Sequence, residues 1–470
     1  MDTKKLRQKI LDLAIRGKLV PQDPNDEPAS VLLERIRAEK EQLIKEGKIK
    51  RSKKSAATDK SHYENVPFEI PENWCWCKLS DVCNFESGYA FSSDDYKDKG
   101  TPLVRISNIQ DGLVSLDNCV YIEGDIDKRF IINNGDLLIA MSGATTGKMG
   151  VYQYDCPALL NQRVGNIKVN TSLLLQKYRD YFMQSQGDLI LKLSYGGAQP
   201  NVSAKIISDL FIPIPSLNEQ EKIVAEIEKW FGFIDEIENG KIELESHIKK
   251  TKSKILDLAI SGKLVPQDPN DEPAIELLKR INPDFESCDN SHYENLPENW
   301  CLAKVKDVFV INPRNKAEDN TIAGFIPMTL IDDGYSNTFS YEKRKWGSIK
   351  TGFTHFADGD VAVAKISPCL ENRKSIVLRD LPNGIGAGTT ELHVFRSSVV
   401  VPEYALYFFK SEYFISKCVG TFNGVVGQQR VGKNIIEEIQ IPIPPINEQT
   451  KIVSTIETIF TKLNTITAEL

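Results

Sequence analysis

Apolar residues recur at steps of three and four in two long stretches, the spacing that places them along one face of an α-helix. The central series consists of Ile223, Ile227, Trp230, Ile234, Ile237, Leu244, Ile248, Ile255 and Leu258. A second series near the C-terminus consists of Ile452, Ile456, Ile459, Leu463 and Ile466. This spacing predicts coiled-coil helices. We expect Asn218 to cap the central helix and Gly262 to end it, which gives about 40 residues and a rod of roughly 60 Å.

Short runs of aliphatic and β-branched residues, bounded by turn residues, predict strands in the two regions between these helices. In the first region we expect strands at 103–107, 120–122, 136–140 and 164–169, a turn at 133–136, and helices at 172–185 and 204–208. In the second we expect strands at 361–364 and 392–395, a helix at 402–416 and another from 433. Both regions are therefore predicted to be mixed α/β domains with a twisted sheet.

Three segments of the chain occur twice. The first repeat, Lys9–Ala29, returns as Lys254–Ala274 with one difference in 21 positions, Arg16 against Ser261. The second and third repeats are Ser61–Asn65 with Pro71–Cys75, which return at 291–295 and 297–301, and Ile212–Gln220, which returns at 441–449. The domains between the repeats barely match. The connecting segments are therefore expected to have the same role in both halves. The domains are expected to have two different versions of a second role.

The repeats also predict how the helices are organised. When the copies are aligned, the C-terminal helix stops about where the N-terminal helix takes up the pattern, so the two terminal pieces together match the central helix. We expect two long antiparallel helices in a pseudo-twofold (circular repeat) organisation, with a domain at each end. The alternative is that each helix packs only on its own domain. The expected parts are 1–60 (repeat helix and basic linker), 61–216 (first domain), 217–290 (central helix and linker), 291–445 (second domain) and 446–470 (helix completing the N-terminal one).

Composition excludes several classes of protein. The chain is 41% hydrophobic, which supports real cores, and its apolar runs are too short to span a membrane. The N-terminus lacks the apolar core of a secretory signal. Nine cysteines without a CxxC pair argue against a disulfide framework or zinc finger and fit a reducing cytoplasm. The net charge of −7 excludes a uniformly basic surface but not a local basic groove.

Polar and basic residues gather in the loops between the predicted strands of both domains. Side chains of these types reach base edges and phosphates, and neighbouring glycines allow close backbone approach, so we predict nucleic-acid contacts. The candidates in the first domain are Tyr89, Arg105, Ser107, Asn108, Ser142, Thr145, Thr146, Lys148, Gln162, Arg163, Gln199 and Asn201. The candidates in the second domain are Arg314, Lys316, Lys343, Arg344, Lys365, Asn372, Arg373, Lys374, Gln428, Gln429, Arg430 and Lys433.

Enzymatic motifs are missing. Ser142–Lys148 is similar to a phosphate-binding loop, but the P-loop pattern requires Gly where Ser142 stands and Ser or Thr where Met149 stands. Contact with a DNA phosphate fits this loop better than NTP hydrolysis. Asn312-Pro-Arg314 lacks the second Pro and the aromatic residue of an adenine methyltransferase loop. With no catalytic triad and no metal cluster in the sequence, we expect a binding subunit with no catalytic or metal site.

Other singled-out residues have ordinary explanations. Trp74 and Trp300 are expected to anchor the start of each domain in its core, and Cys75, Cys77 and Cys83 to be idle thiols. The basic run Lys48–Lys54 is either a solvated linker or a phosphate contact. His62 and His292, which lie in repeated linkers, are expected to serve docking rather than metal binding.

Together these segments resemble the specificity (S) subunits of type I restriction–modification systems. The resemblance is carried by the repeated Leu11–Gln22 segment, the Gly88–Phe91 opening, Gly135–Ile139 leading into Ser142–Lys148, and Ile212–Pro215 with Glu219-Gln220 and their second copies. It covers nearly the whole chain. The second domain departs from the family pattern after Gly359-Asp360, so its loop contacts follow less directly from the resemblance.

The resemblance implies two target-recognition domains, each reading one half of a bipartite, asymmetric site in double-stranded DNA. It implies that the helices set the spacing and dock two methyltransferase subunits, and that two restriction (motor) subunits complete the complex. S-adenosylmethionine, ATP and Mg are then expected only in the partner subunits. The docking candidates are Ile227, Trp230, Ile234, Ile237, Ile456, Ile459 and Leu463.

Two other functions stay open at this point. The first is a coiled-coil scaffold that carries two domains for ligands other than DNA. The second is an NTP-dependent enzyme built on Ser142–Lys148.

Overall fold

The chain divides into two compact units, with the boundary inside the central helix. Unit 1 is Met1–Asn239 and unit 2 is Gly240–Leu470. The computed structural model describes residues 2–47, 66–110, 112–124, 127–194, 200–288, 296–421 and 429–469. The basic run 48–54, His62, His292, Gln199 and Gln428 lie outside the described residues. Both units combine helices with sheets, which confirms the mixed α/β class expected from the sequence.

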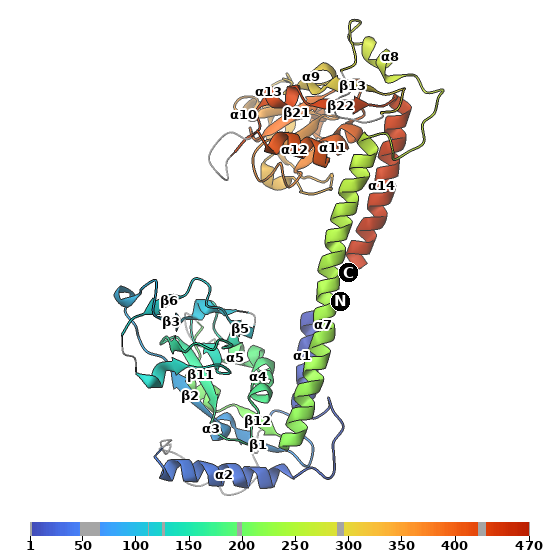
Figure 1. Ribbon diagram of the computed structural model, residues 1–470. Helices are drawn as coiled ribbons and strands as arrows, with labels where there is room; N and C mark the ends of the chain where they lie inside the picture. The colour runs from blue at the N-terminus through green and yellow to red at the C-terminus, as the bar shows by residue number, and fades with distance from the viewer. Residues whose placement is uncertain are drawn as a thin grey trace. The chain divides into compact units, whose positions relative to one another are not determined.

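Unit 1 holds three sheets and the helices that border them (Figure 1). Its strands are β1 (Cys75–Lys78), β2 (Cys83–Ser87), β3 (Thr101–Val104), β4 (Ile109–Gln110), β5 (Gly112–Val114), β6 (Val120–Ile122), β7 (Ile131–Ile132), β8 (Leu137–Ala140), β9 (Met149–Val151), β10 (Ala158–Leu160), β11 (Val164–Val169) and β12 (Phe211–Ile214). Its helices are α1 (Thr3–Ile15), α2 (Ala29–Lys45), α3 (Leu79–Val82), α4 (Gln176–Ser185), α5 (Gly187–Ser194), α6 (Ala204–Ser208) and the first part of α7 (Leu217–Ile260).

Unit 2 also holds three sheets, together with the last part of α7. Its strands are β13 (Cys301–Lys304), β14 (Val310–Ile311), β15 (Ile322–Ile326), β16 (Glu342–Lys345), β17 (Thr354–Ala357), β18 (Val361–Ala364), β19 (Ser375–Val377), β20 (Ile385–Gly388), β21 (Leu392–Arg396) and β22 (Gln440–Ile443). Its other helices are α8 (Ala274–Lys279), α9 (Val305–Val308), α10 (Trp346–Ile349), α11 (Pro402–Lys410), α12 (Glu412–Val419), α13 (Lys433–Glu437) and α14 (Ile446–Glu469).

The divergent domains share one topology. The strand orders in unit 1 are β1-β12, β6-β3-β10-β7 and β2-β11-β8-β9-β5-β4. The orders in unit 2 are β13-β22, β16-β15-β20-β17 and β14-β21-β18-β19, which correspond strand by strand apart from the added β5-β4 edge. The two domains therefore keep a common scaffold although their sequences barely match.

A two-stranded sheet closes each domain at its base. The repeated segments pair antiparallel in the same register, Cys75 opposite Ile214 in unit 1 and Cys301 opposite Ile443 in unit 2. This pairing brings the first and last strands of each domain together, so α7 and α14, which follow the last strands, start beside the strand that begins the domain.

Antiparallel helix pairs form within each unit. Arg7 of α1 pairs with Asp235 and Glu238 of α7, while Gln22, beyond the end of α1, reaches Glu219 at the start of α7. The two segments therefore run in opposite directions (Figure 1). In unit 2, Lys252 of α7 donates to Asn464 of α14, and Asp271, beyond the end of α7, pairs with Lys451 near the start of α14, so these helices also run antiparallel. The joining of α1 and α14 into one composite rod stays a prediction.

Some predicted boundaries were wrong for local reasons. The expected helix at 402–416 is two helices, because Ser411 ends α11 and its hydroxyl accepts the Phe414 amide to cap α12. Asn218 lies inside α7, and the Ser216 hydroxyl instead accepts the amide of Glu219 in the first turn. Gly262 does end the helix, with φ +69°.

Candidate nucleic-acid interface and helix faces

In unit 1 the polar loops meet at one end of the larger sheet. The Tyr89 amide donates to the Leu160 carbonyl and the Gln162 amide donates to the Tyr89 carbonyl, both at 2.9 Å. Gly88 makes this approach possible, since a Cβ there would lie 2.2 Å from the Asn161 carbonyl oxygen. The opening loop is thus fixed against the tight turn between β10 and β11.

A backbone ladder joins this turn to two further loops of unit 1. The Met141 amide donates to the Arg163 carbonyl and the Val202 amide donates to the Met141 carbonyl, each at 2.9 Å. Next to them, Ser142 and Asn201 form an antiparallel bridge. Main-chain atoms alone make these contacts, and the side chains of Arg163 and Asn201 stay exposed while Val202 is buried in the core. We call this set of bonds the loop ladder of unit 1.

Most candidates of unit 1 are accessible, but two are buried. Tyr89, Ser107, Lys148, Gln162, Arg163 and Asn201 are exposed, and Arg105, Ser142 and Thr145 are half-buried. Asn108 is buried, and its carboxamide accepts the Arg105 amide and donates to the Ser115 carbonyl. Buried Thr146 donates its hydroxyl to the carbonyls of Gly143 and Pro200. The prediction that Asn108 and Thr146 face a ligand was wrong, because the loops use their polar atoms internally.

The Ser142–Lys148 loop lacks the architecture of a nucleotide site. It leads into strand β9, whereas a P-loop leads into a helix whose N-terminus faces the phosphates. Its amides close turns on the loop's own carbonyls, Thr146 to Gly143 and Lys148 to Thr145. These bonds occupy donors that a phosphate would need, which argues against an NTP-dependent enzyme.

Unit 2 repeats the loop ladder with other residues. The Lys365 amide donates to the Glu391 carbonyl at 2.9 Å, and the Val431 amide donates to the Lys365 carbonyl at 3.0 Å. Ile366 and Arg430 form the antiparallel bridge. Position by position, Glu391 stands where unit 1 has Arg163, and Arg430 stands where unit 1 has Asn201.

Two neutral histidines hold a further loop of unit 2 in place. His393 accepts from the Asn312 carboxamide at Nδ1 and donates from Nε2 to the Val431 carbonyl. His355 accepts the Asn315 amide at Nδ1 and donates from Nε2 to the Lys350 carbonyl. Burial of the imidazole lowers the pKa of His393 to about 4 and also lowers the pKa of His355. Both rings therefore act as fixed neutral bridges.

The candidates of unit 2 divide in the same way. Arg314, Lys316, Lys343, Asn372, Arg430 and Lys433 are exposed, and Arg344, Lys365, Lys374 and Gln429 are half-buried. Lys374 donates its ammonium to the Ile331 carbonyl. The guanidinium of Arg373 is buried: Nε donates to the Lys410 carbonyl, Nη2 pairs with Glu412, and the group lies 5.2 Å from the Tyr335 ring. The prediction of a DNA contact for Arg373 was therefore wrong, because its donors bind protein.

Sequence reasoning missed Glu391 and His393. Glu391 accepts from Arg430 Nε at 2.7 Å and from Nη2 at 2.9 Å, a bidentate pair. Arg430 holds the pKa of Glu391 below its usual range, and nearby Lys365 adds to this effect. Alignment of the two halves on the Gly-Asp turns (Gly135-Asp136 and Gly359-Asp360) and on the following hairpin would have placed Glu391 opposite Arg163.

The helix candidates also separate into buried and exposed sets. Ile227 and Ile234 are in the core of unit 1, and Ile456 is in the core of unit 2. The interpretation of these three as docking residues was therefore wrong, and they belong to the alternative in which a helix packs on its own domain. Ile459 and Leu463 pack partly against the core of unit 2.

An exposed apolar face remains on α7. Trp230, Phe233 and Ile237 are 42%, 46% and 47% exposed, at the helical spacing of three and four. Large apolar side chains gathered on one helix face make a candidate contact surface. We call these three residues the α7 apolar face.

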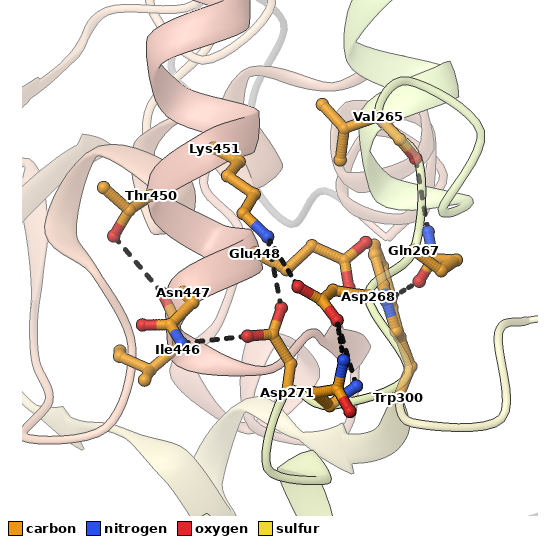
Figure 2. Close-up of polar contacts among 11 residues, drawn as sticks. Val265, Gln267, Asp268, Asp271, Trp300, Ile446, Asn447, Glu448, Thr450 and Lys451 are labelled. Atoms are coloured by element: carbon orange, nitrogen blue, oxygen red, sulfur yellow. Dashed lines mark hydrogen bonds and ion pairs between the residues drawn. The ribbon is translucent and has the colours of Figure 1, made fainter.

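The near-identical repeats build one locking cluster in each unit. In unit 2, shown in Figure 2, Glu448 accepts from the Trp300 indole at 3.0 Å, and Asp271 accepts from Asn447 at 2.9 Å and pairs with Lys451 at 3.4 Å. Trp300 is buried, as predicted for this residue. The lock fastens the start of α14 to the loop that follows α7.

Unit 1 has the same lock with its own copies of these residues. Glu219 accepts from the Trp74 indole at 2.9 Å, and Asp26 accepts from Asn218 at 2.6 Å. Trp74 is buried, as predicted. Burial raises the pKa of Glu219, and burial does the same for Glu448 in unit 2. Because both units make the same contacts, the connecting segments that supply them match in sequence.

The described part of the chain has neither a metal-binding cluster nor a membrane-spanning helix. Within it, no group of three or more His, Cys, Asp or Glu is arranged to hold a metal ion. None of the helices described here combines the length and apolarity needed to cross a membrane.

Comparison with known proteins places these features in a family. Residues 71–246 and 297–470 match the family model described as type I restriction modification DNA specificity domain. The two matched segments contain the two loop ladders. The resemblance inferred from the sequence is thereby confirmed.

Curated relatives are described as type I restriction enzyme specificity subunits. Over 236 residues the chain is 42% identical to the type I restriction enzyme EcoEI specificity subunit of Escherichia coli. The aligned region covers 46% of this chain and 40% of that protein. The EcoAI specificity subunit of Escherichia coli is 42% identical over 234 residues, with 46% and 40% covered. The chain thus spans less than half the length of these two relatives. The EcoKI specificity subunit of Escherichia coli K12 is 23% identical over 413 residues, with 85% and 84% covered.

A solved structure shares the fold. It is a chain described under complex assembly and conformational transition of the type I R-M system. It is 16% identical, covers 86% of this chain and 94% of its own length, and has a TM-score of 0.58.

Proposed function

Because the chain belongs to the family of type I restriction modification DNA specificity domains, we propose that it is the specificity subunit of a type I restriction–modification complex. It reads a bipartite, asymmetric site in double-stranded DNA, with one half read by each unit. The chain itself is non-catalytic. Family membership does not favour the alternative of a scaffold for other ligands.

The observation that carries this proposal is the repeated loop ladder with different outward residues. Unit 1 presents Arg163 and Asn201 where unit 2 presents Glu391 and Arg430. Arginine and asparagine make bidentate contacts to guanine and adenine, and carboxylates accept from cytosine, so the two sets suit two different base sequences. Identical scaffolds with unlike polar ends are what two half-sites require.

Backbone contacts to DNA come from exposed cations among the candidate residues of each unit. Lys148 lies in unit 1, and Lys316, Lys343 and Lys433 lie in unit 2. Such residues position a protein on the duplex without reading its sequence. The net charge of −7 is compatible with this role, because partner subunits add their own phosphate contacts.

The α7 apolar face supports docking of a methyltransferase subunit. Two methyltransferase subunits and two restriction subunits complete the proposed complex, and S-adenosylmethionine, ATP and Mg bind only in those partners. The methyl transfer and the DNA cleavage are then partner reactions, directed by the site that this chain selects.

The test is the adenine methylation pattern of the host, read by single-molecule sequencing with and without the gene. Loss of one bipartite motif on deletion is the expected result, and it supplies both half-sites and their spacing. An unchanged pattern, together with failure of the full chain to co-purify with a methyltransferase, would refute the proposal. Salt-dependent binding of duplex DNA in the presence of that partner is the supporting measurement.

A further inference from the structure

An exposed aromatic residue, Tyr89, lies beside the loop ladder of unit 1. Its side chain is 52% exposed, although both main-chain polar groups of the residue are used. The Tyr89 amide donates to the Leu160 carbonyl, and the Tyr89 carbonyl accepts from the Gln162 amide, both at 2.9 Å. The backbone at this position is therefore fixed to the turn that carries the exposed side chains of Gln162 and Arg163.

Two other aromatic rings hold the Tyr89 ring in place. Phe91 meets it edge-on, with 5.0 Å between the ring centroids and 76° between the planes, and Phe130 lies tilted against it at 5.3 Å. Phe91 packs in turn against buried Leu103 and Leu159. The ring is therefore positioned before any ligand arrives, so binding costs it little conformational freedom.

The exposed part of this ring suits an apolar group on the edge of a base. In an intact duplex the faces of the bases are stacked, so a protein meets their edges in the grooves. In the major groove those edges carry hydrogen-bond donors and acceptors, and the 5-methyl group of thymine is the apolar feature among them. Gln162 and Arg163 on the same turn have side chains that hydrogen-bond to base edges, so the turn presents polar and apolar contacts together.

We propose, on the basis of the proposed function, that Tyr89 reads a thymine in the half-site of unit 1 by packing its ring against the 5-methyl group. The corresponding loop of unit 2, which follows β14, has the sequence Asn-Pro-Arg-Asn-Lys at 312–316 and carries no aromatic residue. His393 and His355 hold that loop through polar contacts instead. Reading of a methyl group through this loop therefore belongs to one half-site only.

The test uses the full chain co-purified with its methyltransferase, and duplexes in which each thymine of the methylated motif is replaced in turn by deoxyuridine. Deoxyuridine lacks only the 5-methyl group. The unsubstituted complex should bind about fourfold more weakly when one thymine of one half-site is replaced, which is the loss expected for one buried methyl group. Tyr89→Ala should bind the thymine and deoxyuridine duplexes equally at that position. Tyr89→Phe, which keeps the ring, should keep the preference.

Tyr154→Ala is the matched control. Tyr154 is another exposed tyrosine of unit 1, with 37% of its surface accessible. It follows β9 at the end of the β8–β9 hairpin that lies opposite the Ser142–Lys148 loop. This variant should therefore keep the preference for the same thymine.

Three results would overturn the inference. The first is that no deoxyuridine weakens binding of the unsubstituted complex, a result that does not depend on the folding of any variant. The second is that the thymine preference persists in Tyr89→Ala, even if this variant binds every duplex more weakly, as expected for a contact to the DNA backbone. The third is loss of the methyltransferase from Tyr89→Ala, which would assign Tyr89 to the interface with that partner. Failure of the proposed function itself looks different, because the unsubstituted complex would then prefer no duplex.

Discussion

His393 joins two loops of unit 2 through a ring whose protonation depends on pH, and a single substitution isolates its effect. The neutral ring joins Asn312 to Val431, and the charges nearest to it are Lys365, Lys433 and Glu437. The informative variant is His393→Gln, whose carboxamide can accept from Asn312 and donate to Val431 but cannot take a proton. The bridge is kept, and the titration is removed.

The size of the effect follows from the pKa of the buried ring. Burial lowers the pKa of His393 from 6.5 to about 4, so the folded chain holds this ring neutral where the unfolded chain protonates it. The resulting stability is fully present above pH 6.5 and is lost as the pH falls from 6.5 toward 4. At a pH of about 5, the linkage relation gives a decrease of about 2 kcal/mol in the free energy of unfolding.

Urea unfolding of both proteins, followed by tryptophan fluorescence at about pH 7.5 and about pH 5, measures this loss. Contributions of other titrating groups cancel in the difference between wild type and variant. With an m-value of about 1–3 kcal/mol per M, the wild-type midpoint for unit 2 should fall by about 0.7–2 M more than that of the variant. Equal shifts in the two proteins would refute the buried neutral bridge.

Three further predictions concern the helix face, the lock and the opening loop. Trp230→Asp should abolish co-purification with the methyltransferase while the circular dichroism spectrum stays unchanged, because this side chain is 42% exposed; retained assembly would exclude the α7 apolar face as the docking surface. Trp300→Phe removes the indole donor of buried Glu448 and should lower the free energy of unfolding, measured in urea, by about 1–3 kcal/mol. An unchanged urea midpoint would mean that the lock adds no stability. Gly88→Ala forces a Cβ against the opposite turn and should lower the free energy of unfolding by about 1–3 kcal/mol and weaken DNA binding. The control is Gly187→Ala, where no atom lies within 4 Å of the added Cβ, and it should change neither the stability nor the binding.

Periodicity and repetition were sufficient to predict the fold class and the long helices. The helical series at 223–258 and 452–466 depends on spacing within one element, and α7 and α14 cover both. The strands at 120–122 and 164–169 were found because aliphatic runs and turn residues are local signals. The common topology of the two domains could not be predicted in this way, because it depends on pairing between strands far apart in the sequence.

The candidate site was harder to predict, because a polar loop residue can serve a ligand or its own backbone. Buried Asn108 and Arg373 have the same side chains as exposed Asn201 and Arg163, and they differ only in the protein groups that folding brings to them. Likewise, Ile227 and Trp230 belong to one heptad series, yet the domain covers the first and leaves the second exposed. Long-range packing decides these cases.

The loop ladders have a consequence for how such a protein acquires new specificities. Their bonds run between main-chain amides and carbonyls, which every residue except proline provides. A codon change at position 163, 201, 391 or 430 therefore alters the chemistry offered to a ligand without removing a bond that shapes the loop. Under the proposed function, single substitutions at these positions change the DNA sequence that is read while the loop architecture stays constant.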